Sequence, residues 1–221
     1  MSPHILPFVP PAHPAVPGGC NELFAAQDAA WAGFMLAHLR GRILWVQDRL
    51  SARETGSPSA LAIDHPLLLM RLSHPRDVLA AAEEALACRD LGAVVAELHG
   101  NPSALSFTAT RRLAVRAEAS GVPLWLVRHA ATPDSSAMRD RWRIGALPSA
   151  AHPDDPAAPG DPCWRVELFR SRDKRPGLWT VRHERGAGGR VWTADRLRFA
   201  ALLPDREMAP DADGARGHAA R

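Results

Sequence analysis

The sequence predicts an α/β fold, in which an open and mostly parallel sheet is flanked by helices and continued by antiparallel strands. From residue 20 to residue 127, short apolar runs alternate with segments of helical periodicity, which is typical of repeated strand–helix–strand units. After Arg128, apolar and polar residues alternate one by one, as they do in antiparallel strands with one covered face.

The first strand–helix–strand unit lies between Gly18 and Asp48. A strand is expected at 20–24 and a helix at about 29–39, where apolar side chains recur at spacings of three and four residues. The second strand, at 43–46, is continuously apolar, which indicates that helices cover both of its faces.

The rest of the parallel part follows in the same alternation. Its expected elements are, in order, a loop at 50–64, a strand at 67–72, a helix at 76–88, a strand at 93–98, a helix from Ser106 or Thr108 to Gly121, and a strand at 122–127. Ser73 is the expected cap of the first of these helices, and Pro75 lies in its first turn. Glu83 and Glu84 are expected on the outward face of that helix.

The antiparallel extension is expected at about 139–193. Its strands are predicted at 139–144, 163–168, 178–183 and 190–192, with a loop at 149–161 and turns at 176–177 and 186–189. The whole domain is expected at 16–200, preceded by an extended proline-rich arm at 1–15 and followed by a disordered tail at 201–221.

The composition leaves the partner open but indicates a cellular setting. Of the 221 residues, 46% are hydrophobic, enough for a core, and the formal net charge of +3 permits an acidic protein or a nucleic acid as partner without requiring either. The three cysteines are widely spaced and form no Cys-x-x-Cys pair, which is typical of a reduced cytoplasmic protein. The first residues show no signal-peptide pattern, and no apolar run is long enough to span a membrane.

The turn after the first strand lacks the residues that an ATPase of this fold uses to bind phosphate. In an ATPase of this build, that turn is glycine-rich and ends in a lysine that binds phosphate. Here it reads Ala25-Ala26-Gln27-Asp28, without glycine or lysine, and Asp28 brings a negative charge to the place of a phosphate. We therefore expect no cofactor and no ATPase activity, and the sequence leaves open whether a nucleotide binds without hydrolysis. The scattered histidines and serines form no metal-binding or hydrolase motif, so neither a metal site nor a hydrolase is predicted.

A set of short motifs in fixed order carries a resemblance to a known family. The motifs are Pro17–Gly19, Ile43–Val46, Glu83–Leu86, Ala93–Leu98, Thr110–Leu113, Arg141–Ile144, Trp164–Leu168, Arg170, Arg172, Arg175–Gly177 and Trp179. Their order resembles the core of the RecA-type recombinase fold. More specifically, the chain is similar over residues 15–185 to ImuA-type proteins, which are RecA-like and SulA-related members of bacterial SOS mutagenesis cassettes.

The resemblance implies a non-catalytic accessory role in DNA repair. ImuA-type proteins act with an inactive Y-family-polymerase-like accessory protein and an error-prone replicative-type polymerase in synthesis past damaged template, and some engage the RecA-type recombinase. The resemblance places Glu97 where RecA-type ATPases hold a magnesium-ligating carboxylate, and Asp48 near their catalytic glutamate. Together with Asp28, these are vestigial ATPase-site positions. The alternative is that these carboxylates only cap the edge of the sheet.

Basic residues of the antiparallel extension are the candidates for binding a protein partner or DNA. Arginines with interleaved tryptophans suit phosphates and bases, or an acidic protein surface. The alternative is a solvent-exposed strand face, paired with Glu167 and Asp173, over tryptophans that belong to the core. The candidates are Arg141, Arg143, Arg165, Arg170, Arg172, Lys174, Arg175 and Trp179.

Two further functions stay open on the sequence alone. One is a module that binds single-stranded DNA through the arginine and tryptophan strands, without any protein partner. The other is a SulA-like inhibitor of cell division, which belongs to the related non-catalytic branch of the same fold. The sequence decides neither the stoichiometry nor the partner.

Overall fold

The computed structural model describes residues 19–26, 28, 30–59, 63–155, 157–184 and 192–202. Its strands are β1 (Cys20–Ala25), β2 (Arg42–Asp48), β3 (Leu67–Leu72), β4 (Leu91–His99), β5 (Leu124–His129), β6 (Asp140–Leu147), β7 (Cys163–Ser171), β8 (Gly177–His183) and β9 (Leu197–Ala201). Its helices are α1 (Trp31–Leu36), α2 (Arg49–Glu54), α3 (Pro75–Ala85), α4 (Phe107–Ser120) and the short 3-10 helix η2 (Ala194–Arg196).

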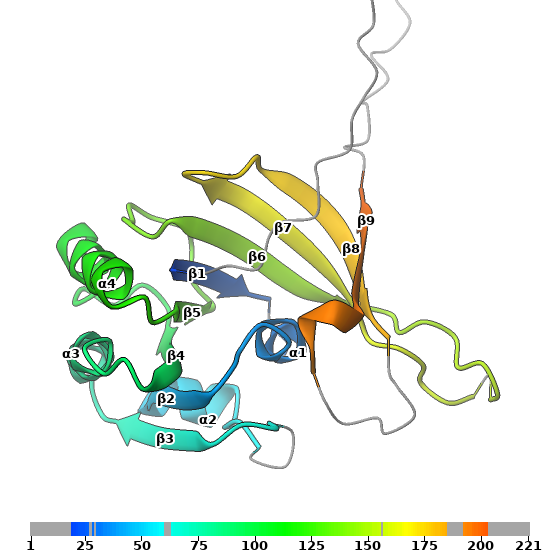
Figure 1. Cartoon of the computed structure of the whole chain (residues 1–221), viewed down its shortest axis with the longest axis horizontal. Helices are drawn as coiled ribbons and strands as arrows, with labels where there is room; N and C mark the ends of the chain where they lie inside the picture. The colour runs from blue at the N-terminus through cyan, green and yellow to red at the C-terminus, as the bar shows by residue number, and fades with distance from the viewer. Residues whose placement is uncertain are drawn as a thin grey trace, which may run out of the picture.

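The strands of this described part form one sheet in the order β3-β2-β4-β5-β1-β6-β7-β8-β9 (Figure 1). The strands from β3 to β6 in that order pair in parallel, and β7, β8 and β9 pair antiparallel. The predicted fold class, a mostly parallel α/β sheet with an antiparallel extension, is confirmed.

The antiparallel pairing begins one strand later than predicted. Strand β6 is the first predicted strand of the extension. On one side it pairs in parallel with β1, and on the other side it pairs antiparallel with β7. The reason is that the chain returns from the carboxyl end of β5 to the amino end of the sheet before β6 starts, where Arg139 N–H donates to the Cys20 carbonyl. Strand β6 therefore runs in the same direction as β1.

Two hydrophobic cores lie on opposite faces of the sheet. One packs α1 against the tryptophan-rich face of the sheet, to which β1, β2 and β4 to β9 contribute, and it includes Trp45, Trp125, Trp142, Trp164 and Trp179. The other packs α3 and α4 against the opposite face of β2, β4, β5 and β1. Figure 1 shows α3 and α4 side by side on the parallel half, while β6, β7 and β8 extend away from them. The face of β6–β8 opposite α1 is therefore not covered by a described helix.

Helix α4 has the boundaries that its capping residues predict. The Ser106 hydroxyl accepts the Ala109 N–H at 3.2 Å, so Ser106 and not Thr108 is the N-cap. At the other end, Gly121 has a φ of 77°, the left-handed conformation that glycine adopts most readily.

Other helix predictions need correction. Helix α2 occupies part of the predicted loop at 50–64, because Asp48 caps it through Ser51 N–H. Helix α1 is shorter than the predicted 29–39. Helix α3 has His74 as its N-cap instead of Ser73, although Pro75 is in the first turn as expected. Glu83 faces inward, because it is 9% exposed and pairs with Arg112 of α4.

The two ends of the sheet also differ from prediction. Strand β3 forms at 67–72 as expected, but it is an edge strand on which Leu68, Leu69 and Met70 are exposed. At the other end, β9 at 197–201 was not predicted, and Ala201, assigned to the tail, pairs with Trp179. The arm at 1–15, the turn at 186–189, most of the strand at 190–192 and the tail beyond Leu202 lie outside the described residues.

Candidate partner-binding surface

The residues predicted to bind a partner do not share one surface. Arg141 and Trp179 are buried, at 3% and 1% exposure, and direct contact with a partner does not fit their burial. Lys174 is partly buried and Arg143 is about half exposed. The remaining candidates are exposed, and they are Arg165, Arg170, Arg172 and Arg175.

The tryptophans expected beside these arginines belong to the core. Trp142, Trp164 and Trp179 are each 1% exposed and lie on the face that packs against α1. Because successive side chains of a strand point to opposite faces, the arginines that alternate with them point away from α1. The predicted stacking platform for nucleic-acid bases is therefore not available at these three rings.

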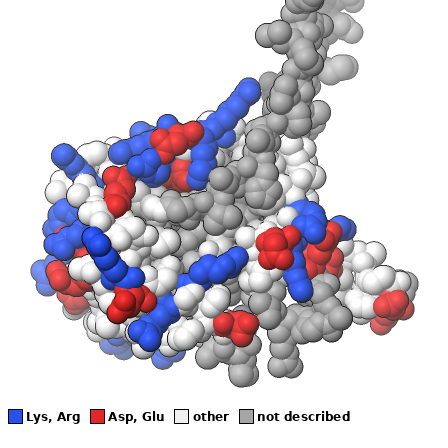
Figure 2. Space-filling model, viewed as in Figure 1, with Lys and Arg blue, Asp and Glu red and all other residues white. Residues whose placement is uncertain are grey.

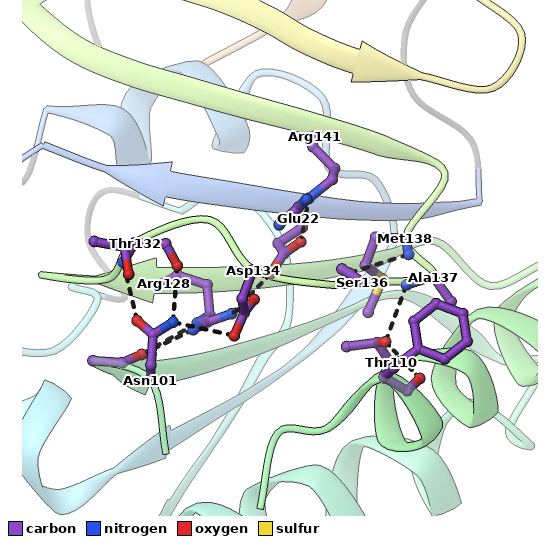
Figure 3. A network of polar contacts seen from close by, with 12 residues as sticks. Glu22, Asn101, Thr110, Arg128, Thr132, Asp134, Ser136, Ala137, Met138 and Arg141 are labelled. Carbon is purple, nitrogen blue, oxygen red and sulfur yellow. Dashed lines mark hydrogen bonds and ion pairs between the residues drawn. The ribbon is translucent and has the colours of Figure 1, made fainter. Parts of the chain in front are cut away.

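Arg141 takes part in a buried ion network instead (Figure 3). Glu22 in the middle of β1 is 0% exposed, and it accepts from Arg141 Nε at 2.7 Å and from Arg128 Nη1 at 2.9 Å. Arg128 is also 0% exposed. The two guanidinium groups lie 5.4 and 5.5 Å from the centroid of the Phe24 ring, within cation–π range. One carboxylate thus holds together β1, β5 and β6.

The network continues from Arg128 into the loops that follow β4 and β5. Arg128 Nε and Nη2 donate to the Gly100 carbonyl at 3.3 and 3.0 Å, and Nη1 lies 3.6 Å from Asp134. Asn101 bridges the loops, since its amide donates to Asp134 and to the Thr132 carbonyl. Glu22 and Arg128 were not among the predicted site residues, although a charged residue within a strand expected to be buried is a signal that an opposite charge is buried nearby.

The turn between β7 and β8 is ordered by a second carboxylate. Asp140 is 1% exposed, and its Oδ1 accepts the Ser171 hydroxyl at 2.6 Å while its Oδ2 pairs with Lys174 Nζ at 2.5 Å. The Ser171 oxygen in turn accepts the backbone N–H groups of Asp173 and Lys174. Lys174 is therefore a structural residue of the turn. The same contacts hold the backbone of residues 171–174 in place.

Arg139 fastens the same turn to α4. Its guanidinium pairs with Asp173 in the turn and, at 2.8 Å, with Glu118 of α4. Hydrogen bonds to these two carboxylates raise the pKa of Arg139 above its ordinary value. Asp173 is thereby occupied by Arg139 and does not neutralise its exposed neighbours in the turn.

The exposed arginines of this turn form the hairpin cluster, which we define as Arg170, Arg172 and Arg175. No carboxylate of the described residues pairs with any of them. Figure 2, seen from the same side as Figure 1, shows lysine and arginine gathered over this end of β7 and β8. The turn lies at the amino edge of the parallel strands, because Ser171 is in register with Asp140 at the start of β6. This edge therefore presents a rigid, net positive projection.

Arg143 and Arg165 lie on the uncovered face of the sheet. The Arg143 guanidinium is 4.2 Å from the centroid of the Phe169 ring and 3.0 Å from Glu167. Arg165 has no ion pair with another described residue, and it lines a pocket of about 440 Å³ together with Arg143. The walls of this pocket are mostly small residues, which include Gly145. It could accept an acidic side chain, but it is separate from the hairpin cluster.

The vestigial ATPase positions lie at the opposite, carboxyl edge. A pocket of about 350 Å³ opens there at the ends of β1, β4 and β5, and Asp28, Glu54, His99 and His129 line it. None of the described residues lining it is a lysine or an arginine. The Asp28 carboxylate accepts the Ala30 N–H at 2.9 Å, so it binds a backbone donor at the start of α1.

Asp48 and Glu97 also have protein donors at the carboxyl edge. Asp48 caps α2 through its Oδ1, which accepts Ser51 N–H at 2.6 Å, while its Oδ2 accepts His99 N–H at 3.2 Å. Glu97 accepts Trp45 Nε1 at 3.0 Å and the Gln47 amide at 2.5 Å, and it lies 3.7 Å from His129 Nε2. Asp48 thus links the start of α2 to the end of β4, and Glu97 links β4 to the side chains of Trp45 and Gln47 in β2.

Neither a metal site nor a membrane-spanning helix is found among the described residues. Within residues 19–26, 28, 30–59, 63–155, 157–184 and 192–202, no three His, Cys, Asp or Glu side chains gather in a way that could hold a metal ion. In the same residues, no helix has the length and apolar character needed to cross a membrane.

Comparison with known proteins shows a similarity along most of the chain. The protein named ImuA from Caulobacter vibrioides strain NA1000 / CB15N is 30% identical over 225 residues, which cover 90% of this chain and 87% of that protein. ImuA from strain ATCC 19089 / CIP 103742 / CB 15 of the same species gives the same values. No protein-family model matches the chain.

Proposed function

This chain belongs to the ImuA family, and from that membership we propose that it is a non-catalytic accessory protein of SOS-induced translesion DNA synthesis and DNA repair. It acts in the cytoplasm as an adaptor for mutagenic polymerase components, for the recombinase, or for both. The partners are a Y-family-polymerase-like accessory protein, an error-prone replicative-type polymerase and a RecA-type recombinase. The observation that supports an adaptor most directly is the fixed hairpin cluster, whose arginines have no described carboxylate partner.

The proposal that the protein is no ATPase is supported by the charges of the carboxyl edge. A protein that binds a nucleoside triphosphate through a phosphate loop surrounds the phosphates with backbone N–H groups and a lysine. The pocket at this edge is lined instead by Asp28 and Glu54, and the only lysine of the chain, Lys174, lies in the β7–β8 turn at the opposite edge. Both carboxylates would repel a phosphate group.

Purified protein tests the absence of catalysis. We expect no hydrolysis of Mg-ATP above the buffer rate, with or without single-stranded DNA. Hydrolysis at the rate of a RecA-type recombinase, lost in the Glu97→Ala variant, would show that the chain is an enzyme. The Glu167→Gln variant is the matched control, because Glu167 lies on the uncovered face of the antiparallel strands.

A binding experiment with purified proteins tests the adaptor role. Tagged protein is mixed in turn with the recombinase, the Y-family-polymerase-like protein and the error-prone polymerase, with nuclease present throughout. We expect capture of at least one of them, and loss of that capture when Arg170, Arg172 and Arg175 are changed to alanine. The control changes Arg49, Arg89 and Arg111, which are also exposed and unpaired in the described part, and it should retain binding.

Single-stranded DNA binding is a second candidate, and the same three arginines favour it. Contacts from arginine to phosphate give binding that weakens as salt rises. The burial of Trp142, Trp164 and Trp179 argues against base stacking there, so we expect weak binding without sequence preference. Anisotropy of a labelled oligonucleotide at two salt concentrations measures it. Tight binding at low salt that weakens as salt rises, and is lost when the three arginines are changed to alanine, would favour the DNA-binding function over the adaptor.

A SulA-like inhibitor of cell division is the remaining alternative from the sequence. No contact of the described residues favours it. Including the tubulin-like division protein in the same capture experiment separates it from the adaptor, because only the inhibitor would retain that protein.

A further inference from the structure

A gap on the uncovered face of the sheet lies beside an arginine without an ion pair. On one face of an antiparallel pair of strands, side chains directly opposite each other make contact. Arg143 and Glu167 do so, since they are in register and 3.0 Å apart. The next residues on this face are Gly145 and Arg165, and the glycine has no side chain to offer. Arg165 is exposed, and no carboxylate among the described residues pairs with it.

The gap forms the pocket of about 440 Å³ introduced above, which we call the sheet-face pocket. Residues of β1, β6, β7 and the loop after β5 line it. Its volume falls within the range of about 300–1,000 Å³ that is typical of ligand sites. Three of the lining residues are charged, Arg143, Arg165 and Glu167, and the others are apolar, among them Ala26 and Pro133. A ligand that matches this lining carries a charge next to an apolar group.

The charges of the pocket match a ligand with one negative charge. Two arginines and one glutamate leave the lining with a net charge of +1. Arg143 is already held, because its guanidinium contacts Glu167 and lies 4.2 Å from the centroid of the Phe169 ring. The charge left for a ligand is therefore that of Arg165. A polyanion such as DNA would bring several phosphates close to Glu167, which would repel them, whereas one carboxylate balances Arg165.

The aromatic rings beside the pocket do not offer a face to a nucleic-acid base. Phe24 is 6% exposed, and the guanidinium groups of Arg128 and Arg141 lie 5.5 and 5.4 Å from its centroid. The Phe169 centroid has Arg141 at 5.3 Å and Arg143 at 4.2 Å. Binding of single-stranded nucleic acid relies on bases that stack on accessible rings. The pocket therefore suits a protein ligand better than DNA.

We propose that the sheet-face pocket binds an acidic side chain of a partner protein together with an apolar side chain next to it. The Arg165 guanidinium donates to the carboxylate, and a charge-assisted hydrogen bond of this kind is about twice as strong as a neutral one. The apolar side chain occupies the gap at Gly145, against Ala26 and Pro133. This inference rests on the proposed function only in taking a protein as the partner, and it names a contact surface apart from the hairpin cluster.

A short peptide with one carboxylate tests the proposal. The probe is a tripeptide of leucine, glutamate and leucine with both termini blocked and an uncharged fluorophore attached, and its control has glutamine in place of glutamate. Anisotropy measures the affinity of each for the full-length protein. We expect the glutamate peptide to bind at least about tenfold more tightly than the glutamine peptide. In protein labelled with ¹⁵N in glycine, the glutamate peptide should shift the Gly145 amide signal, which is assigned from its absence in the Gly145→Val variant.

Two variants locate the site. Arg165→Gln removes the charge that binds the carboxylate, so affinity for the glutamate peptide should fall at least about tenfold. Gly145→Val fills the gap and should block binding without removing a charge. Valine suits this strand position, because an added Cβ would lie 3.4 Å from the Ala26 Cβ, an ordinary contact, and the φ of Gly145 is not positive. Arg89→Gln, at an exposed and unpaired arginine far from the pocket in the sequence, is the control and should bind like the unchanged protein.

Three outcomes would overturn the proposal. The first is equal affinity for the glutamate and glutamine peptides, or binding of neither. The second is binding that is kept in Arg165→Gln but lost when Arg170, Arg172 and Arg175 are changed to alanine, which would place the carboxylate at the hairpin cluster. The third is a larger shift of the Gly145 amide with a thymidine oligonucleotide than with the peptide, which would make the pocket a phosphate site. No recombinase or polymerase is present, so these results are separate from the test of the adaptor function.

Discussion

Changing Glu22 to glutamine should destabilise the protein more than any other single loss of charge in the sheet. The carboxylate is 0% exposed and accepts from Arg128 at 2.9 Å and from Arg141 at 2.7 Å. Glutamine keeps the size and one acceptor oxygen of the side chain but removes the negative charge. Two guanidinium groups, with 0% and 4% of their side-chain surface exposed, would then remain buried without the charge that neutralises them.

The expected loss in the free energy of unfolding depends on which other groups still pair with the two arginines after Glu22 is changed. Removing one partner of a buried ion pair costs about 3–5 kcal/mol. Arg128 keeps the Gly100 carbonyl and an Asp134 carboxylate 3.6 Å away, whereas Arg141 pairs with no second carboxylate among the described residues. We therefore expect a loss of about 3–4 kcal/mol in the free energy of unfolding, out of the 5–15 kcal/mol that is typical of a domain.

Denaturant unfolding measures this loss directly. Seven tryptophans, of which Trp45, Trp125, Trp142, Trp164 and Trp179 are fully buried, make intrinsic fluorescence a sensitive signal. The matched control is Glu167→Gln, which breaks the surface pair with Arg143 and should cost less than about 1 kcal/mol. If Glu22→Gln cost no more than this control, the network would not hold the three strands together, and the reasoning from burial would be refuted.

Three other predictions concern single residues. Asp48→Ala should lower the free energy of unfolding by about 1–2 kcal/mol, because its carboxylate caps α2; an unchanged denaturation midpoint would contradict the cap. Gly92→Ala should lower the free energy of unfolding by about 1–3 kcal/mol, because the added Cβ would lie 1.8 Å from the Arg40 carbonyl oxygen. An unchanged stability would mean that the backbone at Arg40 can move away without cost. Alkylation followed by mass spectrometry should find Cys88 modified first and Cys20 last, since Cys88 is exposed and burial raises the pKa of the Cys20 thiol; the reverse order would refute this.

Strands β2, β4 and β5 could be predicted because each contains a continuous apolar run that is buried inside the sheet. The prediction failed where local sequence carries little signal. Helix α2 has six residues without apolar periodicity, and its start depends on the Asp48 cap instead. Helix α1 is shorter than its apolar pattern, because residues 38 and 39 continue the packing in a tighter final turn, in which the His38 N–H donates to the Met35 carbonyl and the Leu39 N–H to the Leu36 carbonyl. Strand β9 alternates over only five residues at the end of the sheet.

The candidate surface was harder to predict because it depends on which strands become neighbours. Arg141 looks like any other alternating arginine until β6 is placed beside β1, where it is in register with Glu22. That pairing joins residues more than one hundred positions apart, and nothing local indicates it. The same holds for Lys174, whose partner Asp140 belongs to another strand. Exposure of Arg170, Arg172 and Arg175 follows from the turn alone, so these three could be chosen correctly as surface residues.

The two edges of the parallel sheet lead to one last prediction about where a partner binds. The carboxyl edge has a pocket lined by Asp28 and Glu54, while the amino edge carries the three hairpin arginines. An acidic partner is attracted to the amino edge and repelled from the carboxyl edge, so Asp28→Asn and Glu54→Gln together should leave partner capture unchanged or slightly stronger. The asparagine keeps one acceptor oxygen for the Ala30 N–H and loses only the longer bond, of 3.3 Å, from the Ala146 N–H, so the fold should be preserved at a small cost in stability. Loss of capture in this double variant, with capture kept in the hairpin variant, would place the partner at the carboxyl edge.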